Sequence, residues 1–178
     1  KNIKVLYCSS GAVYGQQPQN VSKLKESHPL ISLESMTREK RVYALGKRYA
    51  EESINELSKF GYKCVIARCF AFYGKYLPKN QHFAYGNFVG LAEKGNDIIV
   101  EARNNVYRSY MSADNLSISL LSLLIFNCKN FEIYNVGSPN YILIHDLAHE
   151  ISKKYKVKVI SNKIDESLNH DRYVPDTQ

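Results

Sequence analysis

The hydrophobic pattern of the chain begins with a strand. Ile3, Val5 and Tyr7 recur at every second position, as along a strand, and the small residues Ser9, Ser10 and Gly11 follow where that strand would end. Apolar residues then recur at helical spacing across residues 38–61, at Val42, Leu45, Tyr49, Ile54 and Leu57. Residues 62–69 indicate a second, buried strand. Strand, long helix and strand together predict a crossover unit with a parallel sheet.

Helices and strands continue to alternate towards the C-terminus. The pattern predicts a short helix ending in 88–96, a strand over 97–102, a buried apolar helix over 114–126, a strand over 131–136 and a helix over 144–155. There is no repeat, low-complexity tract or long linker. We therefore expect an α/β protein.

Composition narrows the class of protein. With 178 residues, 44% of them hydrophobic and 23% charged, the chain can form one globular core or part of a larger domain. Its longest apolar run, which starts at Leu116, is too short and too interrupted by serine to span a bilayer. We expect a cytoplasmic protein with no membrane partner.

Cysteines and charge add little specific chemistry. Four cysteines, with no CxxC pair, predict reduced and buried thiols. The net charge of +7 comes from residues spread along the chain, apart from the run 153–158, so a solvated surface or an anionic substrate is favoured over nucleic acid. His145 and His149 have metal-ligand spacing but no third ligand follows, and we expect no metal site.

Tyr43 and Lys47 are the first candidates for catalysis. At positions i and i+4 of a helix their side chains lie on one face, where an ammonium group favours the phenolate needed for proton abstraction. A chain with 14 tyrosines also contains such pairs by chance, as ordinary surface residues. The order of neighbouring motifs decides between the two interpretations.

Several short motifs occur in a specific order along the chain. They are SSGAVYG at 9–15, YALGK at 43–47, ARCFAFYG at 67–74, RSYMSAD at 108–114, YNVGS at 134–138 and RYVPD at 172–176. In this order the chain resembles the extended short-chain dehydrogenase/reductases, the family of NAD-dependent nucleotide-sugar epimerases, dehydratases and reductases. The resemblance covers nearly the whole sequence.

The resemblance implies a fold and a division into domains. The expected fold is a partial Rossmann-type doubly wound parallel sheet with a small α/β substrate-binding domain. Its segments would be 1–74 (C-terminal part of the NAD(P)-binding domain), 75–106 (substrate domain), 107–136 (return to the Rossmann sheet) and 137–178 (substrate domain, truncated).

The resemblance also implies the roles of individual residues. Ser10 matches the serine that binds the reacting sugar hydroxyl, Tyr43 the general base, and Lys47 the residue that assists the base and binds the nicotinamide ribose. The residues implied in cofactor binding are Ser9, Tyr43, Lys47, Cys69 and Phe70. Those implied in binding a nucleotide-diphosphate sugar are Ser10, Asn87, Arg108 and Arg172. An ion pair of Arg108 with Asp114 or another carboxylate is the alternative for that arginine.

Departures from the family pattern refine the reaction. Gly11 and Ala12 stand where dehydratases of the family have a carboxylate, so we expect a C4 epimerase or 4-keto reductase rather than a 4,6-dehydratase. Ala71 replaces a frequent asparagine and Lys75 a frequent proline, which puts substrate phosphate contacts there in doubt.

No Gly-rich dinucleotide turn is found among the nine glycines. We therefore expect a fragment that lacks the N-terminal half of the NAD or NADP site, from an enzyme that would form a homodimer at full length. A non-catalytic remnant or interaction module is the main alternative, and a basic nucleic-acid binder is the third.

Overall fold

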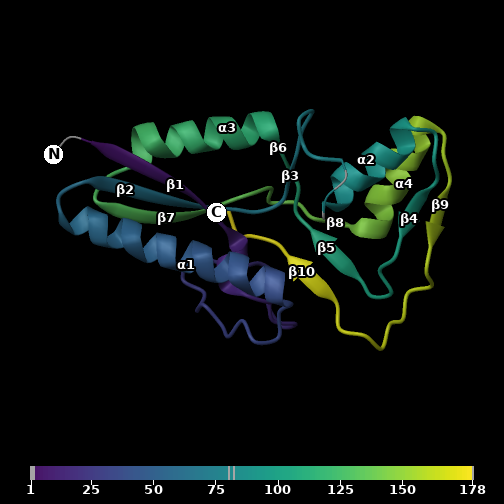
Figure 1. Ribbon diagram of the computed structural model, residues 1–178, viewed down its shortest axis with the longest axis horizontal. Helices are drawn as coiled ribbons and strands as arrows, with labels where there is room; N and C mark the ends of the chain where they lie inside the picture. The colour runs from purple at the N-terminus through teal and green to yellow at the C-terminus, as the bar shows by residue number, and fades with distance from the viewer. Residues whose placement is uncertain (1–2, 80, 82, 178) are drawn as a thin grey trace.

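A three-stranded parallel sheet forms one half of the molecule. The computed structural model describes residues 3–79, 81 and 83–177. The strands β1 (Lys4–Ser10), β2 (Lys63–Cys69) and β7 (Phe131–Val136) are hydrogen-bonded in the order β1-β2-β7 (Figure 1). Because all three run in the same direction, their carboxyl ends meet at one edge, where Ser10 pairs with Cys69.

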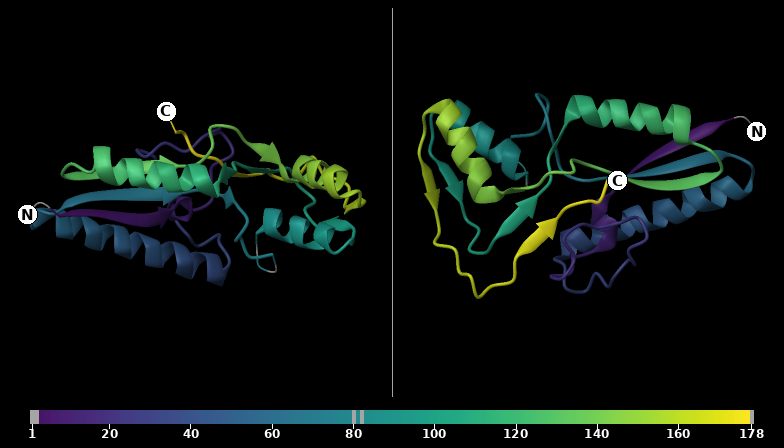
Figure 2. Two further views of the ribbon diagram at one scale, coloured as in Figure 1. Left: turned by 90° about the horizontal axis from the view of Figure 1, so that it is seen from above. Right: turned by 180° about the vertical axis from the view of Figure 1, so that it is seen from behind.

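Helices cover both faces of this sheet. Helix α1 (Arg38–Lys59) lies along one face and α3 (Ala113–Ser122) along the other (Figures 1 and 2). Helix α1 ends before Gly61, whose φ of 85° is a backbone conformation that glycine adopts without a steric penalty. The predicted crossover from β1 through α1 to the parallel strand β2 is thereby confirmed.

The helical spacing of apolar residues in α1 suggested a stripe that faces the core, but the structure does not bury this stripe. Only Ala44 and Glu51 of this helix are buried, whereas Val42 and Tyr49 are 62% and 67% exposed. Ala44 has a small side chain, which lets the helix approach the sheet closely. Glu51 faces the sheet about two turns later and makes polar contacts there. The N-terminal part of the stripe is therefore an exposed apolar surface, while Ile54 and Leu57 are half-buried.

Helix α3 also departs from its prediction as a buried helix. None of its residues is buried, and Ile118 and Leu121 are 63% and 58% exposed. A π-helical turn, η2 (Leu123–Asn127), continues it and leaves Phe126 74% exposed. An apolar composition had suggested burial, but this segment contacts the sheet along one side only.

The other half of the molecule is built around a pair of packed helices. Helices α2 (Ala84–Glu93) and α4 (Ile144–Tyr155) lie side by side next to the parallel pair β4 (Ile98–Val100) and β9 (Val159–Ser161) (Figure 1). Their shared core contains Phe88, Ala92, Ile98, Val100, Ile144, Leu147, Ala148 and Ile151. The bounds of α4 and β7 agree with those predicted.

Short strands join the two halves. Strand β5 (Val106–Arg108) lies between β10 (Asp171–Tyr173), which runs parallel to it, and β8 (Ile142–Leu143), which is antiparallel. Strands β3 (Phe72–Tyr73) and β6 (Met111–Ser112) pair nearby. The sequence pattern had not indicated β10.

The C-terminal segment packs against the loop that follows β1. After β10, the amide of Asp176 donates to the carbonyl oxygen of Leu24 at 2.7 Å, and Leu24 and Pro175 form an isolated bridge. Both Leu24 and Val174 are buried. This return places β10 beside the carboxyl edge of the three-stranded sheet.

The fold is therefore α/β, with a parallel sheet wound on both faces in the Rossmann manner. All four cysteines are free; Cys64 and Cys128 are buried as predicted, but Cys8 is exposed because α1 and η2 leave its side of β1 open. Among the described residues, no helix has the length and apolarity required to cross a bilayer.

Candidate active site

Ser10 lies at the carboxyl end of β1, where the strand turns into a 3-10 helix, η1 (Gly11–Tyr14). Its extended backbone makes it the N-cap, and its hydroxyl oxygen accepts a hydrogen bond from the amide of Ala12 at 3.2 Å. The cap fixes the direction of the hydroxyl. Ser10 is only 8% exposed, so its hydroxyl group is buried at the carboxyl edge of the sheet.

Tyr43 and Lys47 extend from the first half of α1 towards β1. The Lys47 ammonium donates to the carbonyl oxygen of Cys8 at 2.8 Å, which ties the helix to the strand two residues before Ser10. The same nitrogen lies 5.8 Å from the centre of the Tyr43 ring and 5.0 Å from that of Tyr7. The structure thus brings Ser10, Tyr43 and Lys47 to one edge of the sheet, with Tyr43 half exposed.

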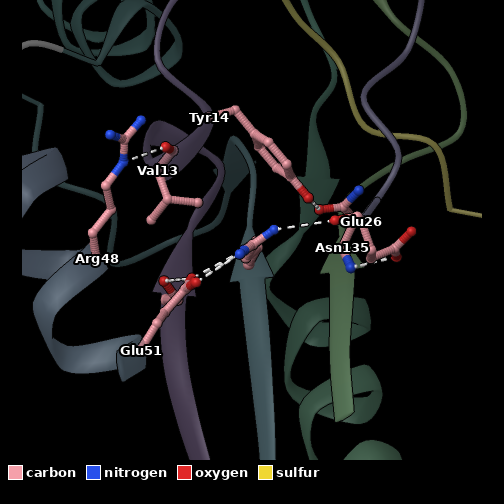
Figure 3. Close-up of polar contacts among 8 residues, drawn as sticks. Val13, Tyr14, Glu26, Arg48, Glu51 and Asn135 are labelled. Carbon is pink, nitrogen blue, oxygen red and sulfur yellow. Dashed lines mark hydrogen bonds and ion pairs between the residues drawn. The ribbon is translucent and has the colours of Figure 1, made fainter. Parts of the chain in front are cut away.

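A buried ion pair anchors α1 beneath this edge. Glu51, one turn beyond Lys47, accepts hydrogen bonds from the Arg68 guanidinium at 2.7 and 3.0 Å and from the Ser9 hydroxyl at 2.5 Å. Figure 3 shows Glu51 pointing from the helix to the ends of the strands. The Ser9 hydroxyl, implied in cofactor binding, is engaged in this network. The sequence feature that points to Glu51 is its spacing, because a residue four positions after Lys47 lies on the same face of the helix.

The polar network continues across the sheet. The Arg68 guanidinium carbon lies 4.8 Å from the centre of the Tyr14 ring, and the Tyr14 hydroxyl donates to Asn135 Oδ1 at 2.8 Å. The backbone amide of Asn135 in turn donates to the Glu26 carboxylate at 2.7 Å (Figure 3). Burial raises the pKa of Tyr14 above its usual value, although Arg68 opposes the shift. Burial alone would lower the pKa of Arg68, but its contacts with Glu51 and Tyr14 raise it overall.

Tyr173 is a site residue that the sequence analysis missed. Its hydroxyl lies 3.2 Å from the Ser10 hydroxyl and donates to the carbonyl oxygen of Cys69 at 3.4 Å. Burial raises its pKa strongly, the Ser10 contact lowers it, and the nearby Tyr43 raises it further. The motif RYVPD contains this tyrosine, but the family resemblance implied a role only for the arginine that precedes it.

Arg108 shares this side of the site. Its guanidinium forms an ion pair with the Asp171 carboxylate, with Nη2 and Oδ2 2.6 Å apart. The expected alternative, an ion pair with Asp114 or another carboxylate, is thus present, with Asp171 as the partner. Arg108 pairs in register with Tyr173, so both side chains project from the same face of this small sheet. Asn87, implied as a second substrate contact, lies partly buried in α2.

Arg172 does not join Arg108. In a strand successive side chains point to opposite faces, and Tyr173 points towards Ser10. Arg172 accordingly lies on the reverse face, where its guanidinium stacks 4.5 Å from the ring of Tyr107, its partner in register. The structure separates the two arginines that the family resemblance had implied as phosphate contacts.

Cys69 is the last residue of β2, and Phe70 follows it directly at the carboxyl edge of the sheet. Burial raises the pKa of Cys69 to about 11, and the nearby Cys8 adds to the shift while Lys47 opposes it. Phe70 is 4% exposed, and its ring occupies the space above Gly11, where an added Cβ would lie 2.6 Å from a ring carbon. The Phe70 ring is thus part of the core.

The two histidines in α4 lie away from this edge. His145 is buried, and burial lowers its pKa, while His149 is exposed. Within 3–79, 81 and 83–177, no three His, Cys, Asp or Glu side chains gather in a way that would bind a metal ion.

Comparison with solved structures identifies the same fold in nucleotide-sugar enzymes. UDP-glucose 4-epimerase of Thermus thermophilus, in complex with NAD, superposes with a TM-score of 0.78 at 20% identity over 98% of this chain and 55% of its own. The Thermotoga maritima UDP-glucose 4-epimerase with UDP-glucose has a TM-score of 0.77 at 16% identity, over 97% of this chain and 54% of its own. The dTDP-glucose 4,6-dehydratase of Bacillus anthracis with NAD superposes with a TM-score of 0.75 at 18% identity, over 98% of this chain and 53% of its own.

The chain thus spans about half the length of these proteins. The sequence matches no curated protein. A family model, described as the NAD dependent epimerase/dehydratase family, matches residues 1–137, which include the Ser10, Tyr43 and Lys47 edge. The chain belongs to the NAD dependent epimerase/dehydratase family.

Proposed function

We propose that this chain provides the catalytic and sugar-nucleotide-binding groups of an NAD(P)-dependent nucleotide-sugar 4-epimerase or 4-keto reductase. The observation that carries the proposal is the convergence of Ser10, Tyr43 and Lys47 at one sheet edge, with Lys47 tied to β1 by its 2.8 Å hydrogen bond. Parallel α/β sheets bind ligands at the carboxyl ends of their strands. Related structures that contain UDP-glucose or NAD support the substrate and cofactor class.

Each of the three residues has a role in this proposal. Tyr43 takes the proton from the sugar 4-hydroxyl, and the Ser10 hydroxyl hydrogen-bonds the same oxygen and orients it. Lys47 stabilises the phenolate by its charge. Because one of its three N–H groups is used by the Cys8 carbonyl, the others remain available for ribose hydroxyls, which fits a nicotinamide nucleotide. When bound, the nicotinamide supplies or accepts the hydride at sugar C4.

Substrate binding is proposed for the same side of β5. The Arg108 guanidinium, 22% exposed and positioned by Asp171, would contact the diphosphate, and Asn87 of α2 would contact the sugar nucleotide. Arg172 is left out of this set because it lies on the reverse face. The implied cofactor contact of Phe70 is proposed for its backbone alone, since its ring is in the core.

The packing at Gly11 supports epimerisation or reduction over dehydration. Dehydration needs an acid and base beside the serine, and a side chain at position 11 would overlap the Phe70 ring. Ala12 offers no titratable group. A 4,6-dehydratase remains the alternative within this class, and a non-catalytic binding module of the same fold the alternative outside it.

We further propose that additional chain supplies the dinucleotide-binding half, next to the free edge of β1. Strand β1 pairs on one side only among the described residues, and the relatives are about twice as long. The homodimer also stays a prediction. Apolar residues exposed on α1 would suit such an interface, which sedimentation velocity can test.

Replacement of Tyr43 by Phe tests the catalytic proposal. In the protein that contains this chain together with a dinucleotide-binding half, Y43F should reduce turnover of a responsive nucleotide sugar by about a hundredfold to ten-thousandfold, since the general base is lost. Turnover is measured by chromatography of the sugar nucleotides and by nicotinamide absorbance. Tyr49→Phe, at an exposed tyrosine of the same helix, is the matched control and should leave turnover unchanged. Near-normal turnover in Y43F would remove Tyr43 from this role.

A further inference from the structure

The reverse face of the β10-β5-β8 sheet contains a cluster of aromatic and basic side chains, here called the outer cluster. Its members are Tyr107, Tyr141, His170 and Arg172. The Tyr107 ring is central: its centre lies 5.7 Å from that of Tyr141, 6.1 Å from that of His170 and 4.5 Å from the Arg172 guanidinium. Tyr141 is 46% exposed, so the cluster reaches the surface.

Two nitrogen atoms of the outer cluster are buried without a partner. Arg172 Nε and His170 Nε2 are inaccessible to solvent and make no hydrogen bond to any described residue. A buried polar atom left unpaired is destabilising, so such atoms usually have a ligand or water partner. Both atoms belong to side chains that neighbour the Tyr107 ring, which points to one acceptor near that ring.

No carboxylate of the described chain provides that acceptor. The neighbouring Asp171 projects to the other face and is paired with Arg108. Arg172 has no ion pair within the part of the chain that the structure describes. Its charge is thus uncompensated, and stacking on Tyr107 holds the guanidinium plane in a fixed orientation.

The border of the outer cluster adds further positive charge. Lys23 donates to the carbonyl oxygen of Pro139 at 2.9 Å, close in sequence to Tyr141, and Gln19 donates to the carbonyl oxygen of His170 at 2.7 Å. The loop after η1 is thereby fixed beside the cluster. The Lys23 ammonium is thus held at residue 139, two positions before Tyr141, while Arg172 supplies the positive charge within the cluster itself.

We propose that the outer cluster is a binding site for an anionic oxygen group, a phosphate or a carboxylate, separate from the sugar-nucleotide site. The Arg172 fork would donate two parallel N–H groups to two oxygens of the anion, and His170 Nε2 a third hydrogen bond. Tyr141 would flank the rest of the ligand. This site goes beyond the proposed function, because it lies on the face of β5 and β10 opposite Arg108 and Tyr173.

NMR of arginine side chains tests the site directly. The Nε–Hε signal of Arg172 is followed in ¹⁵N-labelled protein during titration with sodium phosphate and, separately, with sodium acetate, at constant ionic strength. We expect a saturable shift of this signal. Arg172→Gln should weaken anion binding, measured from the remaining shifted signals, by about tenfold, as for the loss of a charge-assisted hydrogen bond of about 1.4 kcal/mol.

Matched variants separate the outer cluster from other sites. Arg103→Gln, at an exposed arginine just before β5 that is not a member of the cluster, should change the affinity by less than about twofold, as an ordinary surface substitution does. Arg172→Lys keeps the charge but loses the fork, and His170→Asn removes the imidazole; circular dichroism confirms that each variant is folded. Both should bind phosphate more weakly than the parent.

The outcomes decide the proposal and the type of anion. Saturable shifts with phosphate alone would assign a phosphate site, and shifts with both anions a general oxyanion site. Absence of a saturable shift, equal affinity in the folded Arg172→Gln variant, or loss of binding only in Arg108→Gln would overturn the proposal. Turnover and nicotinamide binding do not enter the readout, so failure of the proposed function would leave this result unaffected.

Discussion

Glu51 and Arg68 form an ion pair whose side chains are only 8% and 5% exposed. Each charge is compensated by the other, by the Ser9 hydroxyl on one side and by the Tyr14 ring on the other. A buried pair of this kind adds little net stability over a well-packed apolar pair, yet loss of one member leaves the other charge buried alone. At the residue scale, this pair is the main anchor of α1 beneath Ser10.

Replacement of Glu51 by Ala should therefore be costly. We expect the free energy of unfolding to fall by about 3–5 kcal/mol, because the Arg68 guanidinium keeps its burial and loses its carboxylate. Urea denaturation followed by circular dichroism measures the change. Glu52→Ala is the control, since Glu52 is exposed beside it and should change stability by less than about 0.5 kcal/mol. Equal losses in the two variants would refute the anchoring role.

At the scale of elements, α1 contacts the sheet through few side chains. Ala44 and Glu51 are buried, while the large apolar side chains of α1 are either exposed, as Val42 is, or only half-buried. Two glycines near the site also differ in how closely other side chains pack against them. Gly46, between Tyr43 and Lys47, has open space around its missing Cβ, whereas Gly11 is covered by the Phe70 ring.

The two glycines predict opposite effects of alanine. Gly46→Ala should raise the free energy of unfolding by about 0.5–1 kcal/mol, because alanine has the higher helix propensity and meets no neighbour. Gly11→Ala should lower it by about 1–3 kcal/mol, because the new methyl group would displace the Phe70 ring. Thermal unfolding of both variants beside the parent measures the difference. A loss of stability in Gly46→Ala would show that this face of α1 is covered.

At the scale of the whole molecule, the described fold corresponds to about half of the solved relatives. They have the same fold over this chain and about as many residues again. In the proposed function, the free edge of β1 is the surface where the dinucleotide-binding half would pack. In a Rossmann-type domain, the pyrophosphate of the cofactor binds at the Gly-rich turn, which these residues do not contain.

Cofactor binding by the 178-residue chain tests this view. Isothermal titration calorimetry with NAD and with NADPH should show no binding or binding weaker than about 1 mM, since Lys47 and Tyr43 contact only the ribose end in the proposal. Micromolar affinity for either nucleotide would contradict it. A protein in which a Gly-rich strand-turn-helix segment precedes Lys1 is the positive control and should bind in the micromolar range.

Local pattern was sufficient for the longer helices and strands, but not for short strands such as β5 and β10. The periods of apolar residues predicted the β1, α1 and β2 crossover and the bounds of β7 and α4, because hydrogen bonding within a helix and alternation along a strand act over a few residues. The order of the motifs was sufficient for the family and for placing Ser10, Tyr43 and Lys47 in one site. Gly11 could be identified as lacking a carboxylate, but not as the contact of Phe70.

Contacts between distant segments were decided by the tertiary structure alone. Tyr173 reaches Ser10 across 163 positions, and the pairing of β10 with β5 places Arg172 on the reverse face and Asp171 beside Arg108. The burial of Glu51 instead of the apolar stripe of α1 depends likewise on Arg68 of another strand. Such choices follow from strand register and from the packing of whole elements, which no periodicity within one segment records.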